Sequence, residues 1–207
     1  MSRDFLPRVF QADLHRLYTR VILPTLGNLP LHDDVKTGGI AASMDELLDN
    51  AEKSTSNLLA FEARRCFALT LAGVFERQLR IWVRSHVHEA EKAGVATRKF
   101  QPLLEEAEAR HGLDLETNRL AQAIEELYLL ANAVRHGDGP SVGKLRAYAP
   151  HLWQYPTAVH ATKSEEQAIL SEGIQVADAD FIRYMRAVTR FWGLADCEFG
   201  AIIDGPY

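Results

Sequence analysis

The chain has 207 residues, of which 47% are hydrophobic and 25% are charged, and its formal net charge is −5. This composition is typical of one globular domain that can bury a core, and it excludes wholesale disorder and a globally basic nucleic-acid coat. We expect no disulfide framework from the two cysteines, no membrane span, because no apolar run is long enough, and no secretory leader. We therefore expect a cytoplasmic protein without membrane contact.

Apolar residues recur with the helical period along most of the chain. In chain order, the pattern predicts a helix over residues 4–23, a loop over 24–42, a long helical region over 43–93 with a break near 54–57, and helices over 98–111 and 115–136. Residues 137–163 are expected to be irregular, followed by a short helix over 164–171, a strand fragment over 173–176 and a last helix over 179–194 with Asp178 as its N-cap. Because almost all of these elements are helices, the predicted class is all-α and the predicted architecture is a helical bundle.

Four apolar stripes are predicted to face the core. They are Phe5, Val9, Leu14, Leu17 and Val21 in the first helix; Phe67, Leu71, Val74, Phe75, Leu79 and Trp82 in the long region; Leu120, Ile124, Leu127, Ala131 and Val134 before His136; and Phe181, Met185, Val188 and Trp192 in the last helix. Cys66 lies in apolar helical sequence, and we expect a buried structural thiol there rather than a nucleophile.

The chain contains no motif for a cofactor or a metal ion. It has no glycine-rich phosphate loop, no C-x-x-C and no H-E-x-x-H. His86 and His88 are two residues apart, so on a helix they would point to nearly opposite sides and could not share one ion. We expect neither a cofactor nor a metal.

Basic residues gather between positions 64 and 84, where five arginines accompany a single acid, Glu76. Arg77, Arg80 and Arg84 are spaced i, i+3, i+7 and share a face opposite the apolar stripe. One interpretation is a ridge that binds the phosphates of RNA. The other is a solvated face with ion pairs to the acidic helix that carries Glu105, Glu106 and Glu108.

The most distinctive segment is LLANAVRHGDGPS, residues 129–141. Asn132 and His136 are four residues apart on one helical face, and Arg135 adds a permanent cation beside a histidine that titrates near neutral pH. This combination suits acid–base work on a phosphodiester. The alternative is that Arg135 and His136 only offset the helix dipole, with Gly137 capping the last turn.

The string ANAVRHG on a late helix resembles the HEPN family (higher eukaryotes and prokaryotes nucleotide-binding). FALTLAGVFERQLRIWV and DFIRYMRAVTRFW are similar to the long first core helix and the final helix of that family. The resemblance implies a HEPN-like helical bundle over residues 43–196, preceded by an N-terminal helix and loop over 1–42 and followed by a tail over 197–207. Many family members are metal-independent ribonucleases of toxin–antitoxin, CRISPR and phage-defence systems, and two copies build one cleft from a motif of Arg, four to six residues, then His.

Carried onto this chain, the resemblance makes His136 the motif histidine and Asn132 the polar residue, whereas Ala131 stands where the motif arginine would be. It implies a homodimeric RNA-cleaving effector, in which we expect His136 to be the general acid or base, Arg135 to stabilise charge on the phosphate, and Asn132 to orient His136 or a phosphate oxygen. The competing hypothesis is a non-catalytic module that binds RNA or a nucleotide, or that assembles with an antitoxin or another defence protein.

Overall fold

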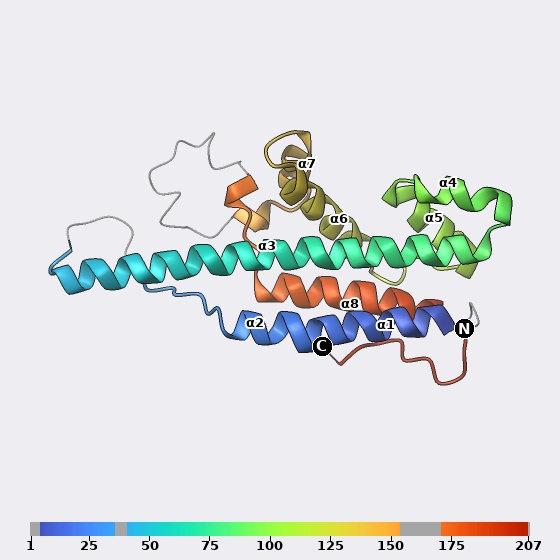
Figure 1. The fold of residues 1–207 in the computed structure, drawn as a ribbon, viewed down its shortest axis with the longest axis horizontal. Helices are drawn as coiled ribbons and strands as arrows, with labels where there is room; N and C mark the ends of the chain where they lie inside the picture. Colours follow the sequence, from blue (N-terminus) through green and yellow to red (C-terminus); the bar gives the residue numbers. More distant parts are fainter. Residues whose placement is uncertain (1–4, 36–40, 154–170, 207) are drawn as a thin grey trace.

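The computed structural model describes residues 5–35, 41–153 and 171–206. Within these ranges every regular element is helical, which confirms the all-α class (Figure 1). The elements are α1 (Leu6–Leu17), a π-helical turn (Tyr18–Ile22), α2 (Leu23–Gly27), α3 (Met44–His86), a 3₁₀ turn (Glu89–Glu91), α4 (Lys92–Ala96), α5 (Phe100–His111), α6 (Ala121–His136), α7 (Pro140–Tyr148), two further 3₁₀ turns (Pro150–Trp153 and Ser171–Gly173) and α8 (Asp178–Ala195). No helix among the described residues is apolar over a long enough stretch to cross a membrane.

Helix α3 is the spine of the molecule, with α1 and α8 packed along one side and α5 and α6 along the other (Figure 1). Ser43 caps its N-terminus by accepting a hydrogen bond from the backbone N–H of Glu46 at 3.2 Å. The predicted break near residues 54–57 is wrong, because the helix runs without interruption through them. Asn57 joins this part of the helix to the segment before it, because its side chain accepts a hydrogen bond from the N–H of His32 at 2.7 Å and donates one to the carbonyl of His32 at 2.8 Å.

The core forms where α1, α3 and α8 meet. Phe75 of α3 lies edge-on to Phe191 and Trp192 of α8, with ring centroids 5.3 and 6.0 Å apart, and Trp192 donates its indole N–H to the side chain of Gln78 at 2.9 Å. The prediction that Phe75 and Trp82 are core residues is confirmed, since each is 1% exposed. The predicted inward face of α8 is buried as well.

The inward face of the first helix differs from the prediction. Apart from Pro7 in its first turn, its buried residues recur every four positions, at Phe10, Leu14, Tyr18, Ile22 and Leu26, whereas Phe5 and Val21 are exposed. A strict four-residue repeat is longer than the 3.6-residue period of an α-helix. The π-helical turn at Tyr18–Ile22 absorbs the difference and keeps this face against the bundle.

Several other local predictions are corrected. Residues 137–153 are largely helical, because Pro140 occupies the first turn of α7, where a proline needs no N–H partner. Residues 173–176 form no strand, and Asp178 is the first residue of α8, with Ala177 as its N-cap. Helix α6 begins at Ala121. It follows a turn in which the carboxylate of Asp114 accepts hydrogen bonds from the N–H and the hydroxyl of Thr117. Cys66 and Cys197 are both exposed, so the expected buried thiol at position 66 is wrong. The predicted helix over 164–171 lies almost entirely outside the described residues.

Candidate functional site

The three residues predicted to be catalytic lie together at the C-terminal end of α6. Gly137 ends the helix with φ of 65° and donates its N–H to the carbonyl of Ala133 at 3.0 Å. Arg135 and His136 are exposed and Asn132 is half-buried. None of the three side chains makes a hydrogen bond or an ion pair with another described residue, so their donors and acceptors are available to a ligand.

The position of the missing motif arginine is part of the core. Ala131 is 3% exposed. It borders a small hollow between α3 and α6, together with Phe75 and Phe100 on the inner side and Asn132 and Arg135 at the rim. The rim therefore holds the polar side chains, and residue 131 faces away from solvent.

The predicted arginine ridge on α3 is divided between two roles. Arg80 donates to the backbone carbonyls of Val95, Ala96 and Arg98 at 2.8 to 3.0 Å, and it forms an ion pair with Glu76 at 2.7 Å. It thus fastens the C-terminal end of α4 to α3, which occupies its guanidinium. Arg77 and Arg84 are exposed and make no hydrogen bond or ion pair with the described residues.

The acidic partners that the alternative interpretation assigned to this ridge lie elsewhere. Glu106 of α5 pairs with Arg98, and with Arg110 at 2.5 Å. Arg77 and Arg84 therefore keep their positive charge at the surface of α3 without neutralisation by α5.

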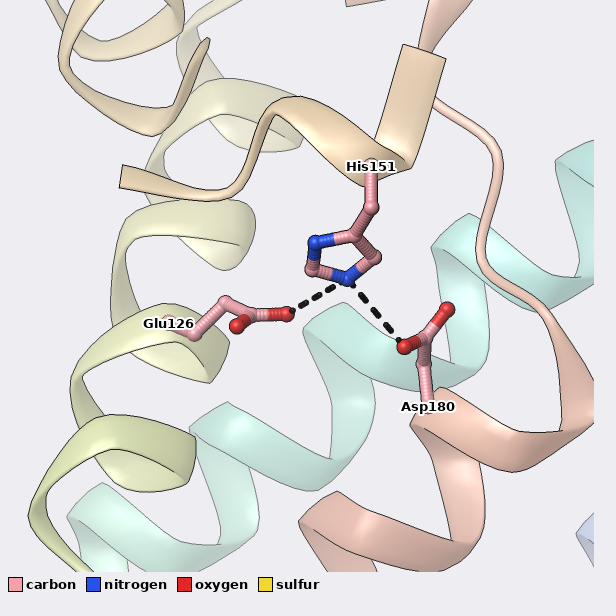
Figure 2. A group of neighbouring side chains, drawn as sticks. All are labelled: Glu126, His151 and Asp180. Carbon is pink, nitrogen blue, oxygen red and sulfur yellow. Dashed lines mark hydrogen bonds and ion pairs between the residues drawn. The ribbon is translucent and has the colours of Figure 1, made fainter. Parts of the chain in front are cut away.

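A buried polar cluster around Glu126 was not predicted from the sequence. The carboxylate of Glu126 lies inside the bundle, 1% exposed, and accepts hydrogen bonds from Tyr184 at 2.5 Å and from both terminal nitrogens of Arg183 at 2.5 and 3.1 Å. As Figure 2 shows, the Nε2 atom of His151 reaches between Glu126 and Asp180, at 3.4 and 3.2 Å from their oxygens. This cluster joins α6, α8 and the 3₁₀ turn that follows α7.

The charges of the cluster reinforce one another. Burial raises the pKa of Tyr184, and the neighbouring carboxylate of Glu126 raises it further, so the phenol stays protonated and donates its hydrogen bond. Burial is the largest single influence on Arg183 and would lower its pKa, but the hydrogen bond to Glu126, the charge of that carboxylate and the hydrogen bond to Asp180 together outweigh burial and raise the pKa of Arg183 above its ordinary value. Arg183 therefore remains charged opposite the carboxylate.

Glu126, His151 and Asp180 also meet the distance requirement for binding a metal ion, since one ligand atom from each lies within 4.8 Å of the others. The guanidinium of Arg183, however, already bonds the same oxygens of Glu126 and Asp180, at 2.5 and 3.2 Å. A cation would have to displace another cation that is held by both carboxylates. The donor set therefore fits a structural ion-pair network better than a metal centre.

Comparisons of the chain with protein-family models, with curated proteins and with solved structures found no match. The likeness to HEPN proteins stays a prediction carried by the three sequence segments that resemble the family. The features of this chain that bear on function are therefore the exposed end of α6 and the charged side chains around it.

Proposed function

We propose that this protein binds RNA through the C-terminal end of α6, as a HEPN-like homodimer. The observation that carries the proposal is the group Asn132, Arg135 and His136, whose polar atoms are unengaged by the described residues and reach the surface at one helix end. A cation, an imidazole and an amide at the same helix end offer the kinds of group that contact a nucleic-acid backbone.

Each side chain has a distinct part in this proposal. Arg135 supplies a planar, permanently charged fork for a phosphate. His136 offers ring nitrogens for a hydrogen bond, and Asn132 offers an amide to a phosphate oxygen or a base edge. A two-fold axis near this end of α6 would place two such groups opposite each other and double the contact.

Metal-independent RNA cleavage at the same residues is the second candidate function. It is favoured by the exposure of His136 beside Arg135, since a histidine with solvent access can exchange protons with a 2′-hydroxyl or a leaving group. The buried Ala131 favours binding without cleavage, because the charge that the family motif would place there is absent. The resemblance, rather than a contact in the structure, supports a cytoplasmic toxin–antitoxin or phage-defence setting with a partner protein.

The test combines binding and cleavage on purified protein. We expect labelled single-stranded RNA to bind the wild type, and Arg135→Ala and His136→Ala to weaken binding, whereas His88→Ala, an exposed histidine outside α6, leaves it unchanged. Incubation with total RNA in EDTA then distinguishes the candidates, because a catalytic His136 would contribute about 10²–10⁴ in rate. RNA affinity that is the same in all three variants would refute the α6 site, and a strict monomer in light scattering would refute the dimer.

A further inference from the structure

The N-terminal part of α3, residues 44–59, forms an arm that extends beyond the other described helices at one end of the molecule (Figure 1). With a rise of 1.5 Å per residue, this arm is about 24 Å long. Ala60, the residue after it, is the first buried residue of α3. The arm therefore belongs to the longest helix of the bundle without contributing a side chain to the core.

The side of the α3 arm that faces the rest of the chain is polar. Lys53 forms an ion pair at 2.6 Å with Asp34, in the segment after α2. Asn57 bonds the backbone N–H and carbonyl of His32 in the same segment. At 100° per residue, Lys53 and Asn57 lie on the side of the helix that continues into the buried Ala60. Polar contacts thus hold the arm where a helix ordinarily places apolar ones.

The opposite side of the arm is apolar although it faces solvent. On the helical wheel its large apolar residues lie within an arc of about 120°, centred on Ala51 and Thr55. Their exposed fractions run from 44 to 67%, and they are Met44, Leu47, Leu48, Leu58 and Leu59. We call this surface the leucine face. Single exposed leucines are ordinary, whereas a continuous apolar stripe on a helix that has turned its polar side inward marks a contact with another molecule.

The charges beside the leucine face are negative. The arm holds one ammonium, that of Lys53, and four carboxylates, those of Asp45, Glu46, Asp49 and Glu52. Lys53 is engaged by Asp34 and by Asp49, at 2.6 and 2.9 Å. Asp45 and Glu52 are exposed along one edge of the leucine face, and neither makes a hydrogen bond or an ion pair with another described residue. A molecule that covers this face would gain most by bringing positive charge to that edge.

We propose that the leucine face binds a basic amphipathic helix of a partner protein. The apolar stripe of the partner helix covers the leucines, as helices do when they pair along apolar seams, and its lysines or arginines lie against Asp45 and Glu52. A second copy of the arm is a poorer occupant, because it brings the same excess of carboxylates and an ammonium that is already engaged. This inference is independent of the proposed RNA binding, since it uses no residue at the end of α6.

The probe for this surface is a labelled synthetic helix of known charge. A peptide of about 18 residues, about 27 Å long as a helix, carries leucines at i, i+3, i+4 spacing with lysines along both edges. A matched peptide has glutamate in place of every lysine. Fluorescence anisotropy with the full chain gives the affinity for each peptide at several salt concentrations, and circular dichroism checks that each protein variant is folded.

Two double variants and one control separate the apolar and the charged contributions. Leu48→Gln with Leu59→Gln removes two side chains from the leucine face. Asp45→Asn with Glu52→Gln removes the two charges at its edge and keeps the size of both side chains. The control removes two exposed apolar side chains from elsewhere on the molecule, by Leu23→Gln with Ile81→Gln.

We expect the wild type to bind the lysine peptide about tenfold or more tightly than the glutamate peptide, with a difference that shrinks as salt rises. The leucine variant should lose about tenfold or more in affinity for the lysine peptide, because less apolar area is buried on binding. The charge variant should lose about threefold or more together with most of the salt dependence. The control should bind like the wild type.

Three results would overturn the proposal. The first is equal affinity of the leucine variant and the control for the lysine peptide, and the second is equal affinity of the wild type for the two peptides. The third is a dimer in sedimentation velocity that dissociates only in the leucine variant, which would assign the face to a second copy of this chain.

Discussion

The ion pair between Glu126 and Arg183 offers a quantitative test of how the site is built. Arg183→Met removes the guanidinium but keeps a side chain of similar length. The Glu126 carboxylate, 1% exposed, would then keep only the hydroxyl of Tyr184 at 2.5 Å and His151 at 3.4 Å. A buried charge that loses its partner is the costly case, because the desolvation of the remaining group is no longer compensated.

The expected loss is about 3 kcal/mol of unfolding free energy, at the lower end of the range of 3–5 kcal/mol for breaking buried pairs. We choose the lower end because the Arg183 side chain is 35% exposed and water can reach its position. For a chain of this size, that loss lowers the melting temperature by about 6–12 °C. Urea denaturation monitored by circular dichroism measures the free energy directly.

The double variant Glu126→Leu with Arg183→Met serves as the control, since replacing both members of a buried pair with apolar residues is often neutral. We expect it to recover most of the loss. If Arg183→Met unfolds within about 1 kcal/mol of the wild type, or if the double variant is no more stable than the single one, Glu126 does not depend on Arg183 and the network described around it is wrong.

Two further predictions concern stability. Gly193→Ala would place a Cβ atom 2.5 Å from the carbonyl oxygen of Ile202, so we expect the free energy of unfolding to fall by about 1–3 kcal/mol in thermal melts. Gly73→Ala, also within a helix but with nothing within 4 Å of the added Cβ, should raise it by about 0.5–1 kcal/mol. A change of the same sign in both variants would contradict the packing of the tail against Gly193. Burial, together with His86, lowers the pKa of His111. As pH drops below about 6.5, the unfolded state therefore binds a proton at this residue more readily than the folded state does, and the free energy of unfolding falls. His111→Phe keeps the stacking on Trp82 and should flatten this decline in urea titrations between pH 6.5 and about 5; an unchanged slope would exclude His111 as its source.

Much of the helical organisation was predictable, because an amphipathic period in sequence becomes a buried face whenever a helix packs on one side. This holds for α5 and α8, whose predicted bounds agree with the structure to within two residues. It fails where a helix departs from the α period, as at the π-helical turn Tyr18–Ile22, and where tertiary packing makes a helix from proline- and glycine-rich sequence, as in α7.

Glu126 illustrates a limit of the same reasoning. Its neighbours Ile124 and Leu127 face α3, and a charged residue between them suggests a solvent-facing position. Yet Glu126, Leu130 and Ala133 are spaced i, i+4, i+7, and all three are buried on a second face of α6. The spacing of Glu126 with Leu130 and Ala133 could therefore have indicated a buried position. The partners of Glu126, Arg183 and Tyr184, lie more than 50 residues away in sequence, and no local pattern connects them to it.

The arginines make the same point about function. Arg77, Arg80 and Arg84 have the same spacing as Arg183, Arg186 and Arg190, so the sequence alone cannot rank the two rows. The fold separates them: Arg80 is held by three backbone carbonyls at the end of α4, whereas in the α8 row Arg183 is held by Glu126 and Asp180, and Arg190 by Asp204. Charge periodicity marks a candidate surface, and only the packing around it shows which guanidinium groups face a space that a ligand can enter.

The burial of Ala131 changes what its identity means for catalysis. In the sequence, Ala131 stands where the HEPN motif has an arginine, and a single substitution would restore that arginine. In the structure it is 3% exposed and shares a hollow with Phe75 and Phe100, so a guanidinium at this position would have to be desolvated among aromatic rings or push α6 away from α3. In the proposed cleavage reaction the cation is therefore Arg135, one position before His136 and about 100° around the helix from it. In that geometry the arginine and histidine of one protomer leave the helix in different directions, and the α6 end of the second protomer in the proposed homodimer would bring a further cation and imidazole to the same strand.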